Sequence, residues 1–99
     1  MTQPTHATIA TFRMDRAREA EQHEGLRRVI VPGVCKSPGF LTGHWTLDRE
    51  LSESVALITF DCREHAEAFA VNVRANAANQ AAVGIELVSI RVVEVSANA

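Results

Sequence analysis

Two stretches of helical periodicity, set between short runs of strand-forming residues, limit the folds open to this chain. The first follows Asp15, an N-capping residue type, and predicts a helix from Arg16 onward. Its stripe of positions expected to be buried is Ala20, His23, Leu26, Val29, Ile30 and Val34. Pro32 and Gly33 fall inside this stripe and predict a kink, because proline lacks an amide proton and clashes with the preceding turn.

The second helical stretch follows Asp61, which forms the pattern of a capping box with Glu64. Its buried stripe is expected to be Cys62, Ala66, Phe69, Val73 and Ala77. Another side of this helix carries Asn72, Asn76 and Asn79. These amides indicate either a solvated face or a ligand-binding side. Gly84 suits the turn that follows the helix.

Four runs read as strands: residues 6–13, 40–47, 54–60 and 85–95. The middle two are joined by the charged loop 48–53, which predicts a hairpin. The order is therefore strand, helix, strand, strand, helix, strand, which is the ferredoxin-like arrangement. It predicts an α+β fold, in which a four-stranded antiparallel sheet carries both helices on one face. The 99 residues, 1–99, fit a single domain.

The strands are apolar on both faces, although two helices can cover only one face of a sheet. In residues 54–60, Val55, Leu57 and Thr59 point one way. The residues between them, Ala56, Ile58 and Phe60, point the other way. A second copy of the sheet would cover the remaining face, so we expect a homodimer. The alternative is that some of these side chains are exposed, as much apolar surface is.

Charge and composition exclude several partners. The formal net charge is −2 and the basic residues are scattered, which argues against nucleic acid or an anionic membrane as a partner. No apolar run approaches the roughly 20 residues of a membrane span, and no leader pattern opens the chain. Cys35 and Cys62 form no CxxC pair and are expected to be free thiols of a cytoplasmic protein.

The segments SPGFLTGHW, VALITFDCREHAEAF and GIELVSIRVVEV resemble the dimeric α+β barrel superfamily, in particular its antibiotic-biosynthesis monooxygenase-like branch. Members often carry Pro-Gly-Phe at the start of the second strand, as at residues 38–40 here. The resemblance implies ferredoxin-like protomers whose sheets pair into a barrel around a small cavity. Activities in the superfamily include cofactor-free oxygenation of polyphenols, haem degradation and lactone isomerisation.

The resemblance does not extend to the haem-degrading members. Those members carry tryptophan near the end of the third strand, where this chain has Phe60, and a histidine well into the second helix, where it has Ala70. The histidine of this helix, His65, falls in its first turn. Quinone-forming oxygenases of the superfamily tend to line the cavity with tyrosine, which is absent here. No cofactor is expected. Nor is a metal, because no two histidines have ligand-like spacing.

The face that each hairpin residue occupies depends on register. We place Leu47 opposite Val55. Gly43 and Trp45 then pack on the helices, together with Val55, Leu57 and Thr59. The opposite face becomes a cavity wall with His44 among its residues, and a slip of one residue would exchange the faces. The residues expected to line the cavity with His44 are Phe40, Thr42, Phe60 and Arg91.

Of the residues in this wall, His44 is the one whose side chain could act in catalysis. A neutral imidazole can act as general base on a phenolic or enolic proton. Alternatively, it hydrogen-bonds a threonine or a water and does nothing more. Arg91 could hold an anionic group or lie at the rim. His23, on the first stripe, is expected to be half-buried beneath its helix.

Three kinds of function are compatible with these features. The first is a dimeric barrel that binds a small apolar or aromatic molecule. The second is a cofactor-independent monooxygenase that acts on a phenolic or quinol substrate, with His44 as base. The third is a dimeric interaction module without a ligand. An enclosed, partly polar cavity favours the first two, and a filled barrel favours the third.

Replacement of His44 by alanine tests its predicted role. If His44 is the base, His44→Ala abolishes turnover of phenolic or quinol compounds in the presence of oxygen and leaves the dimer intact. Oxygen uptake and size-exclusion chromatography measure the two effects. Unchanged turnover would remove His44 from the mechanism.

Overall fold

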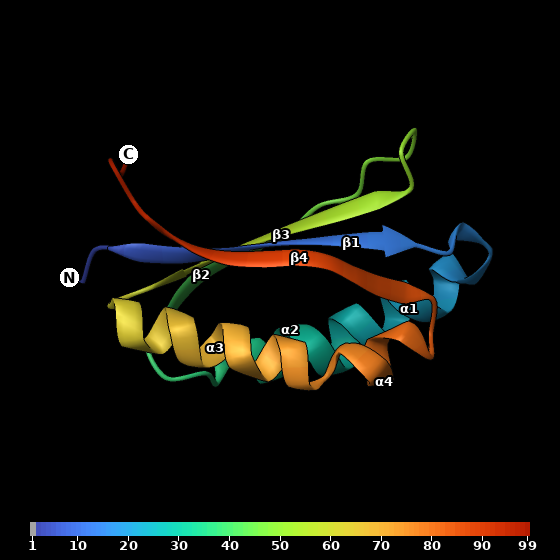
Figure 1. The fold of residues 1–99 in the computed structure, drawn as a ribbon, viewed down its shortest axis with the longest axis horizontal. Helices are drawn as coiled ribbons and strands as arrows, with labels where there is room; N and C mark the ends of the chain where they lie inside the picture. Colours follow the sequence, from blue (N-terminus) through green and yellow to red (C-terminus); the bar gives the residue numbers. More distant parts are fainter. Residues whose placement is uncertain (1) are drawn as a thin grey trace.

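The computed structural model describes residues 2–99 and contains one four-stranded sheet with the helices on one face (Figure 1). The strands are β1 (His6–Met14), β2 (Phe40–Trp45), β3 (Glu53–Phe60) and β4 (Ile85–Glu94). Their order in the sheet is β2-β3-β1-β4, and every neighbouring pair is antiparallel. The predicted α+β, ferredoxin-like fold is confirmed.

The first helical arm has four consecutive parts: η1 (Arg16–Arg18), α1 (Glu19–Gly25), η2 (Leu26–Ile30) and α2 (Val31–Cys35). The predicted cap is confirmed, because the carboxylate of Asp15 accepts a hydrogen bond from the amide of Ala17 at 3.1 Å. The predicted kink takes the form of a π-helical turn, η2, which ends two residues before Pro32. The chain stays helical because the altered turn accommodates the proline ring.

The second arm consists of α3 (Arg63–Ala75) and the short α4 (Ala77–Ala81). The predicted capping box is wrong. The N-cap residue is Cys62 and makes no side-chain capping bond. The carboxylate of Asp61 instead contacts the ring of His65 at 2.6 Å. Gly84 adopts a positive φ of 80° in the turn that leads into β4, as expected for this position.

The hairpin register differs from the prediction by one residue. Trp45 lies opposite Ala56, and an isolated bridge joins Asp48 to Glu53. The two faces of β3 are therefore exchanged: Ala56, Ile58 and Phe60 face the helices, and Val55, Leu57 and Thr59 face away. The loop fixes this register, because the Asp48 carboxylate accepts the amide protons of residues 50 and 51 and so tightens the turn.

Gly43 and Trp45 occupy the helix-facing side of β2, as predicted. Trp45 packs against both clusters of buried residues. A Cβ atom at Gly43 would lie 2.9 Å from ring atoms of Trp45 and 3.1 Å from Ile58. Only glycine leaves room for the indole at this place.

Within residues 2–99, no helix covers the other face of the sheet (Figure 1). Leu57 in β3, which lies on this face, is 39% exposed, and Val88, at the bulge in β4, is 50% exposed. Among residues 2–99, no helix has the length and apolar character that crossing a membrane requires.

Gly43→Ala is expected to destabilise the fold by about 1–3 kcal/mol, because the added methyl group displaces the Trp45 ring. Urea denaturation followed by circular dichroism measures the change. Gly25→Ala is the control, since nothing lies within 4 Å of its Cβ position and the residue is helical. The free energy of unfolding of Gly25→Ala should exceed that of wild type by about 0.5–1 kcal/mol. Equal stabilities for the two variants would contradict the packing role of Gly43.

Candidate functional site

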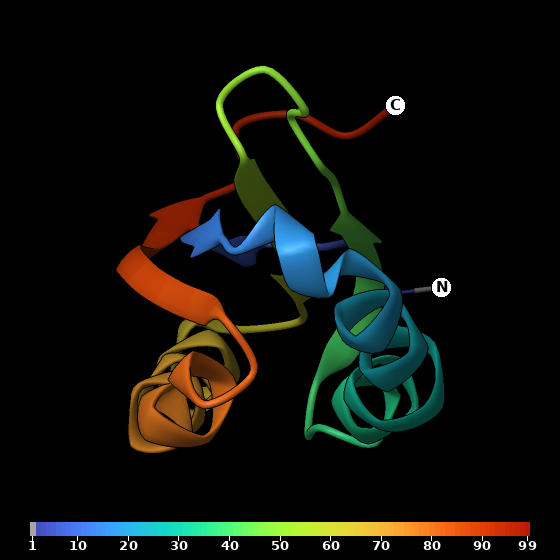
Figure 2. The same cartoon turned by 90° about the vertical axis from the view of Figure 1, so that its right-hand side faces the viewer.

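A cleft of about 840 Å³ lies between the two helical arms, under the sheet. Figure 2 looks along the molecule and shows α1–α2 on one side and α3–α4 on the other. The sheet forms the floor of the cleft and the helical arms form its walls. Its volume is within the range of small-molecule sites.

The cleft is deepest at its centre, because the residues of the sheet there have small side chains. Ala10 of β1 and Ala56 of β3 lie opposite each other in the sheet, and both are buried floor residues. Trp45 is the neighbour of Ala56 on β2. Larger apolar side chains surround the alanines, so the space above them is bounded by Phe12, Ile58, Phe69 and Ile85.

The first arm lines the cleft with the stripe that was expected to be buried. His23, Leu26, Val29 and Ile30 all face this space. Val29 is 70% exposed and His23 is also exposed, so the prediction of a half-buried His23 is wrong. Most of the stripe lies away from the sheet. This arm contacts the strands mainly through α2, which packs against β2. The buried polar residue of the arm is instead Gln22, whose Nε2 donates to three backbone carbonyls at 2.9–3.3 Å.

The second arm lines the cleft with both apolar and amide side chains. Phe69 and Val73 are the apolar contributors. The amide contributors are Asn72, Asn76, Asn79 and Gln80. The helical spacing of the asparagines was a sequence signal for this wall, and the structure places them along the cleft.

Thr8 is the buried polar residue of the floor. Its side chain is 1% exposed, and Oγ1 has no hydrogen-bond partner within residues 2–99. Sequence reasoning missed it, because threonine is an ordinary residue of a strand.

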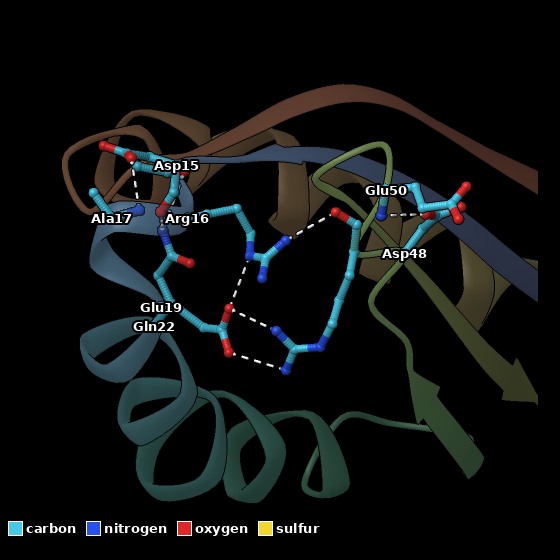
Figure 3. Close-up of polar contacts among 9 residues, drawn as sticks. Asp15, Arg16, Ala17, Glu19, Gln22, Asp48 and Glu50 are labelled. Carbon is cyan, nitrogen blue, oxygen red and sulfur yellow. Dashed lines mark hydrogen bonds and ion pairs between the residues drawn. The ribbon is translucent and has the colours of Figure 1, made fainter.

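Three of the residues that line the cleft are charged. They lie where the β2–β3 loop meets α1, which we call the mouth of the cleft, and Figure 3 shows Arg16 and Glu19 there. Arg49, in the β2–β3 loop, makes a bidentate ion pair with Glu19 of α1 at 3.1 and 3.2 Å. Arg16 donates to Glu19 at 2.8 Å and to the backbone carbonyl of Arg49 at 2.9 Å. The hydrogen bonds from Arg49 and then Arg16 lower the pKa of Glu19 below its ordinary value. The triad ties the loop to the first arm and leaves one positive charge uncompensated.

The five residues predicted to line a cavity are divided between the two sides of the sheet. Phe40 and Phe60 lie opposite each other and pack in the core on the helix side. Thr42 and His44 face the open side, opposite Thr59 and Leu57. Arg91 is also on the open side, opposite Ile9. The one-residue register shift explains the separation of Phe60 from His44.

Asp61, Cys62 and His65 offer metal-ligand atoms that lie within 4.8 Å of one another. The ring of His65 hydrogen-bonds Asp61 and lowers the pKa of that carboxyl. The positive end of the α3 dipole lies at the same place and disfavours a cation. The pairing of His65 with Asp61 fixes the turn between β3 and α3.

No protein-family model matches the chain, and no curated protein matches it in sequence. Solved structures with the same fold include MupZ from Pseudomonas fluorescens, at 16% identity over 93% of this chain and 68% of that one, with a TM-score of 0.66. The NE2512 protein of unknown function from Nitrosomonas europaea is 20% identical over 100% and 96%, with a TM-score of 0.68.

A third similar structure is the monooxygenase from the gene ActVA-Orf6 of Streptomyces coelicolor, in complex with the ligand Nanaomycin D. It is 14% identical over 97% of this chain and 89% of that one, with a TM-score of 0.63. At these identities, the similarities confirm the fold that the resemblance implies.

Glu19→Gln should destabilise the protein at neutral pH, because it removes the carboxylate that both arginines share. The pKa of Glu19 is lowered by folding, so its contribution is complete above the ordinary glutamate pKa and is lost as the pH falls through the lowered value. The stability difference between wild type and variant should therefore shrink in acid and in high salt. Thermal denaturation from pH 7 to pH 3 measures it.

Glu50→Gln is the matched control. Glu50 lies in the same loop and makes no ion pair in the part of the chain that the structure describes. A pH-independent difference for Glu19→Gln, or the same profile for both variants, would contradict the role of the triad.

Proposed function

We propose that this protein binds a small, planar aromatic molecule in the cleft between the sheet and the helical arms. The observation that carries the proposal is the exposed apolar stripe of the first arm. Val29 is 70% exposed and is one of the residues that line the cleft. Apolar walls that face each other across an open space gain free energy when an apolar ligand fills that space.

The lining favours an aromatic ligand with a few polar substituents. Phe12, Trp45 and Phe69 contribute ring surfaces from three different elements. Rings of this kind stack on, or meet edge to face with, an aromatic ligand. The asparagine wall and the arginines at the mouth offer hydrogen-bond donors to oxygen substituents. The fold shared with a monooxygenase that was solved with Nanaomycin D supports the same kind of ligand.

A second candidate function is cofactor-independent monooxygenation of a phenolic or quinol substrate, which the same structural similarity favours. In this reaction an ionised phenol reduces molecular oxygen. One oxygen atom becomes the new carbonyl oxygen of a quinone, and the other leaves as water. The protein has to hold the ring, take the phenolic proton and keep bulk water away.

Two histidines could take that proton, at two different places. His23 lines the cleft, and His44 lies on the open face of the sheet. If the substrate occupies the cleft, His23→Ala lowers turnover and His44→Ala does not. The reverse result would place the reaction on the open face, as the sequence predicts for His44.

The open face is proposed to pair with that of a second copy. Leu57 exposes apolar surface there, and Ile9 of β1 and Val93 of β4 lie on the same face. Two such faces pack about 10 Å apart. Thr42, His44 and Arg91 would then lie between the sheets of the homodimer. A pairing that binds no ligand in either space is the third candidate, an interaction module.

Ligand binding in the cleft is tested with 1,4-naphthoquinone, a planar probe that quenches tryptophan fluorescence. Trp45 is the only tryptophan of the chain and faces the cleft, and there is no tyrosine. The Trp45 fluorescence of the wild-type protein should fall to a plateau as the quinone concentration rises. Asn72→Phe should weaken binding by tenfold or more, because the ring enters the cleft from its wall.

Val71→Phe is the control, since Val71 is the neighbouring residue on α3 and is 60% exposed outside the cleft. Its affinity should equal that of wild type. Linear quenching without saturation in wild type, or equal weakening by both variants, would contradict binding in the cleft.

Leu57→Glu is expected to convert a dimer into a monomer, because it places a charge at the centre of the open face, where burial would desolvate it. Size-exclusion chromatography with light scattering measures the mass. Val71→Glu, on the helical side, should stay dimeric. A monomeric wild type, or a dimeric Leu57→Glu, would refute pairing through this face.

A further inference from the structure

Thr8 occupies the middle of the cleft floor. It lies in β1 between Ile58 of β3 and Val92 of β4, and it faces the helix side of the sheet. Its side chain is 1% exposed. Oγ1 is buried and finds no hydrogen-bond partner anywhere in residues 2–99.

A buried hydroxyl without a partner is rare and unfavourable, because folding removes its hydrogen bonds to water and returns none. Valine has nearly the same shape as threonine and would fill this place without that loss. The neighbours of Thr8 in the sheet, Ile58 and Val92, are themselves apolar and offer no side-chain acceptor. Oγ1 has almost no accessible surface in this structure. The hydroxyl therefore fits a partner that enters the cleft and displaces the side chains that now cover it.

The other polar groups around the cleft are less suited to this task. The Nε2 atom of Gln22 already donates to three carbonyls, while its oxygen points to the side where the Arg16 side chain lies (Figure 3). Arg16 and Arg49 are held by Glu19 at the mouth. Thr8 is the floor group whose hydrogen-bonding capacity is unused.

We propose that Thr8 is the specificity-determining residue of the cleft, and that its hydroxyl bonds an oxygen substituent on the inner edge of an aromatic ligand. This inference rests on the proposed binding of such a ligand in the cleft. A threonine hydroxyl both donates and accepts. It therefore accepts from a phenolic hydroxyl and donates to a quinone carbonyl, so that the reduced and the oxidised forms of one ring system are both retained.

The test compares two ligands that differ by one oxygen atom, 1-naphthol and naphthalene, as competitors of 1,4-naphthoquinone in the Trp45 quenching assay. Wild type should prefer 1-naphthol by about two- to tenfold, the range expected for one neutral hydrogen bond. Thr8→Val should remove this preference and leave the affinity for naphthalene unchanged or higher. The melting temperature of the unliganded variant should not fall, because the valine needs no partner.

Three further variants complete the design. Thr8→Ser keeps the hydroxyl and should keep the preference. Thr8→Ala should lose the preference for 1-naphthol. This variant tests the role of the hydroxyl if Thr8→Val does not fold. Thr11→Val removes a hydroxyl from the same strand on the opposite face, where Thr11 lies opposite Val55, and should keep the preference.

The outcomes separate this inference from the proposed function. If neither ligand displaces the quinone and the quinone itself does not bind, the cleft is not a binding site and both proposals fail. If both ligands bind and Thr8→Val retains the preference for 1-naphthol, binding in the cleft stands and the role of Thr8 is overturned.

Discussion

The cleft depends on the unequal distances at which the two helical arms pack on the sheet. The second arm packs closely, because its small residues Ala66 and Ala70 on α3 pack in the core against the strands, and both are 1% exposed or less. The first arm has one buried apolar contact with the sheet, Val34 of α2. Ile30 packs beside Val34, whereas Val29 of the same stripe is 70% exposed. Alanines at the centre of the sheet deepen the space between the arms, so the cavity follows from residue size rather than from a missing element.

Polar groups are distributed over the cleft in a way that suits an oriented ligand. The floor offers a hydroxyl, one wall offers amides, and the mouth carries two arginines that share one carboxylate. The triad of Arg16, Glu19 and Arg49 joins the β2–β3 loop to α1. The open face of the sheet has a different character, with His44 and Arg91 among apolar side chains. The helix side of the sheet thus contains a cleft, and the open side is a partly apolar surface.

The order of the elements, the Asp15 cap, the turn at Gly84 and the helix-facing side of Gly43 and Trp45 could all be predicted from the sequence, because each depends on local pattern. The hairpin register could not be predicted, since a shift of one residue changes the pairing but not the alternation, and the placement of Phe60 failed with it. Periodicity also identified the stripe of the first helix without revealing how far it stands from the sheet. Thr8 gave no signal, because a threonine in a strand looks the same whether or not its hydroxyl finds a partner.

The most direct test is a crystal structure of the protein grown with 1,4-naphthoquinone. The account predicts that the ring lies between the helical arms, against Trp45 and above the central alanines, with one carbonyl oxygen within hydrogen-bond distance of Thr8 Oγ1. A ring bound between two sheets beside His44, with the helix-side cleft closed by side chains, would contradict it and would return the site to the face that the sequence alone had indicated.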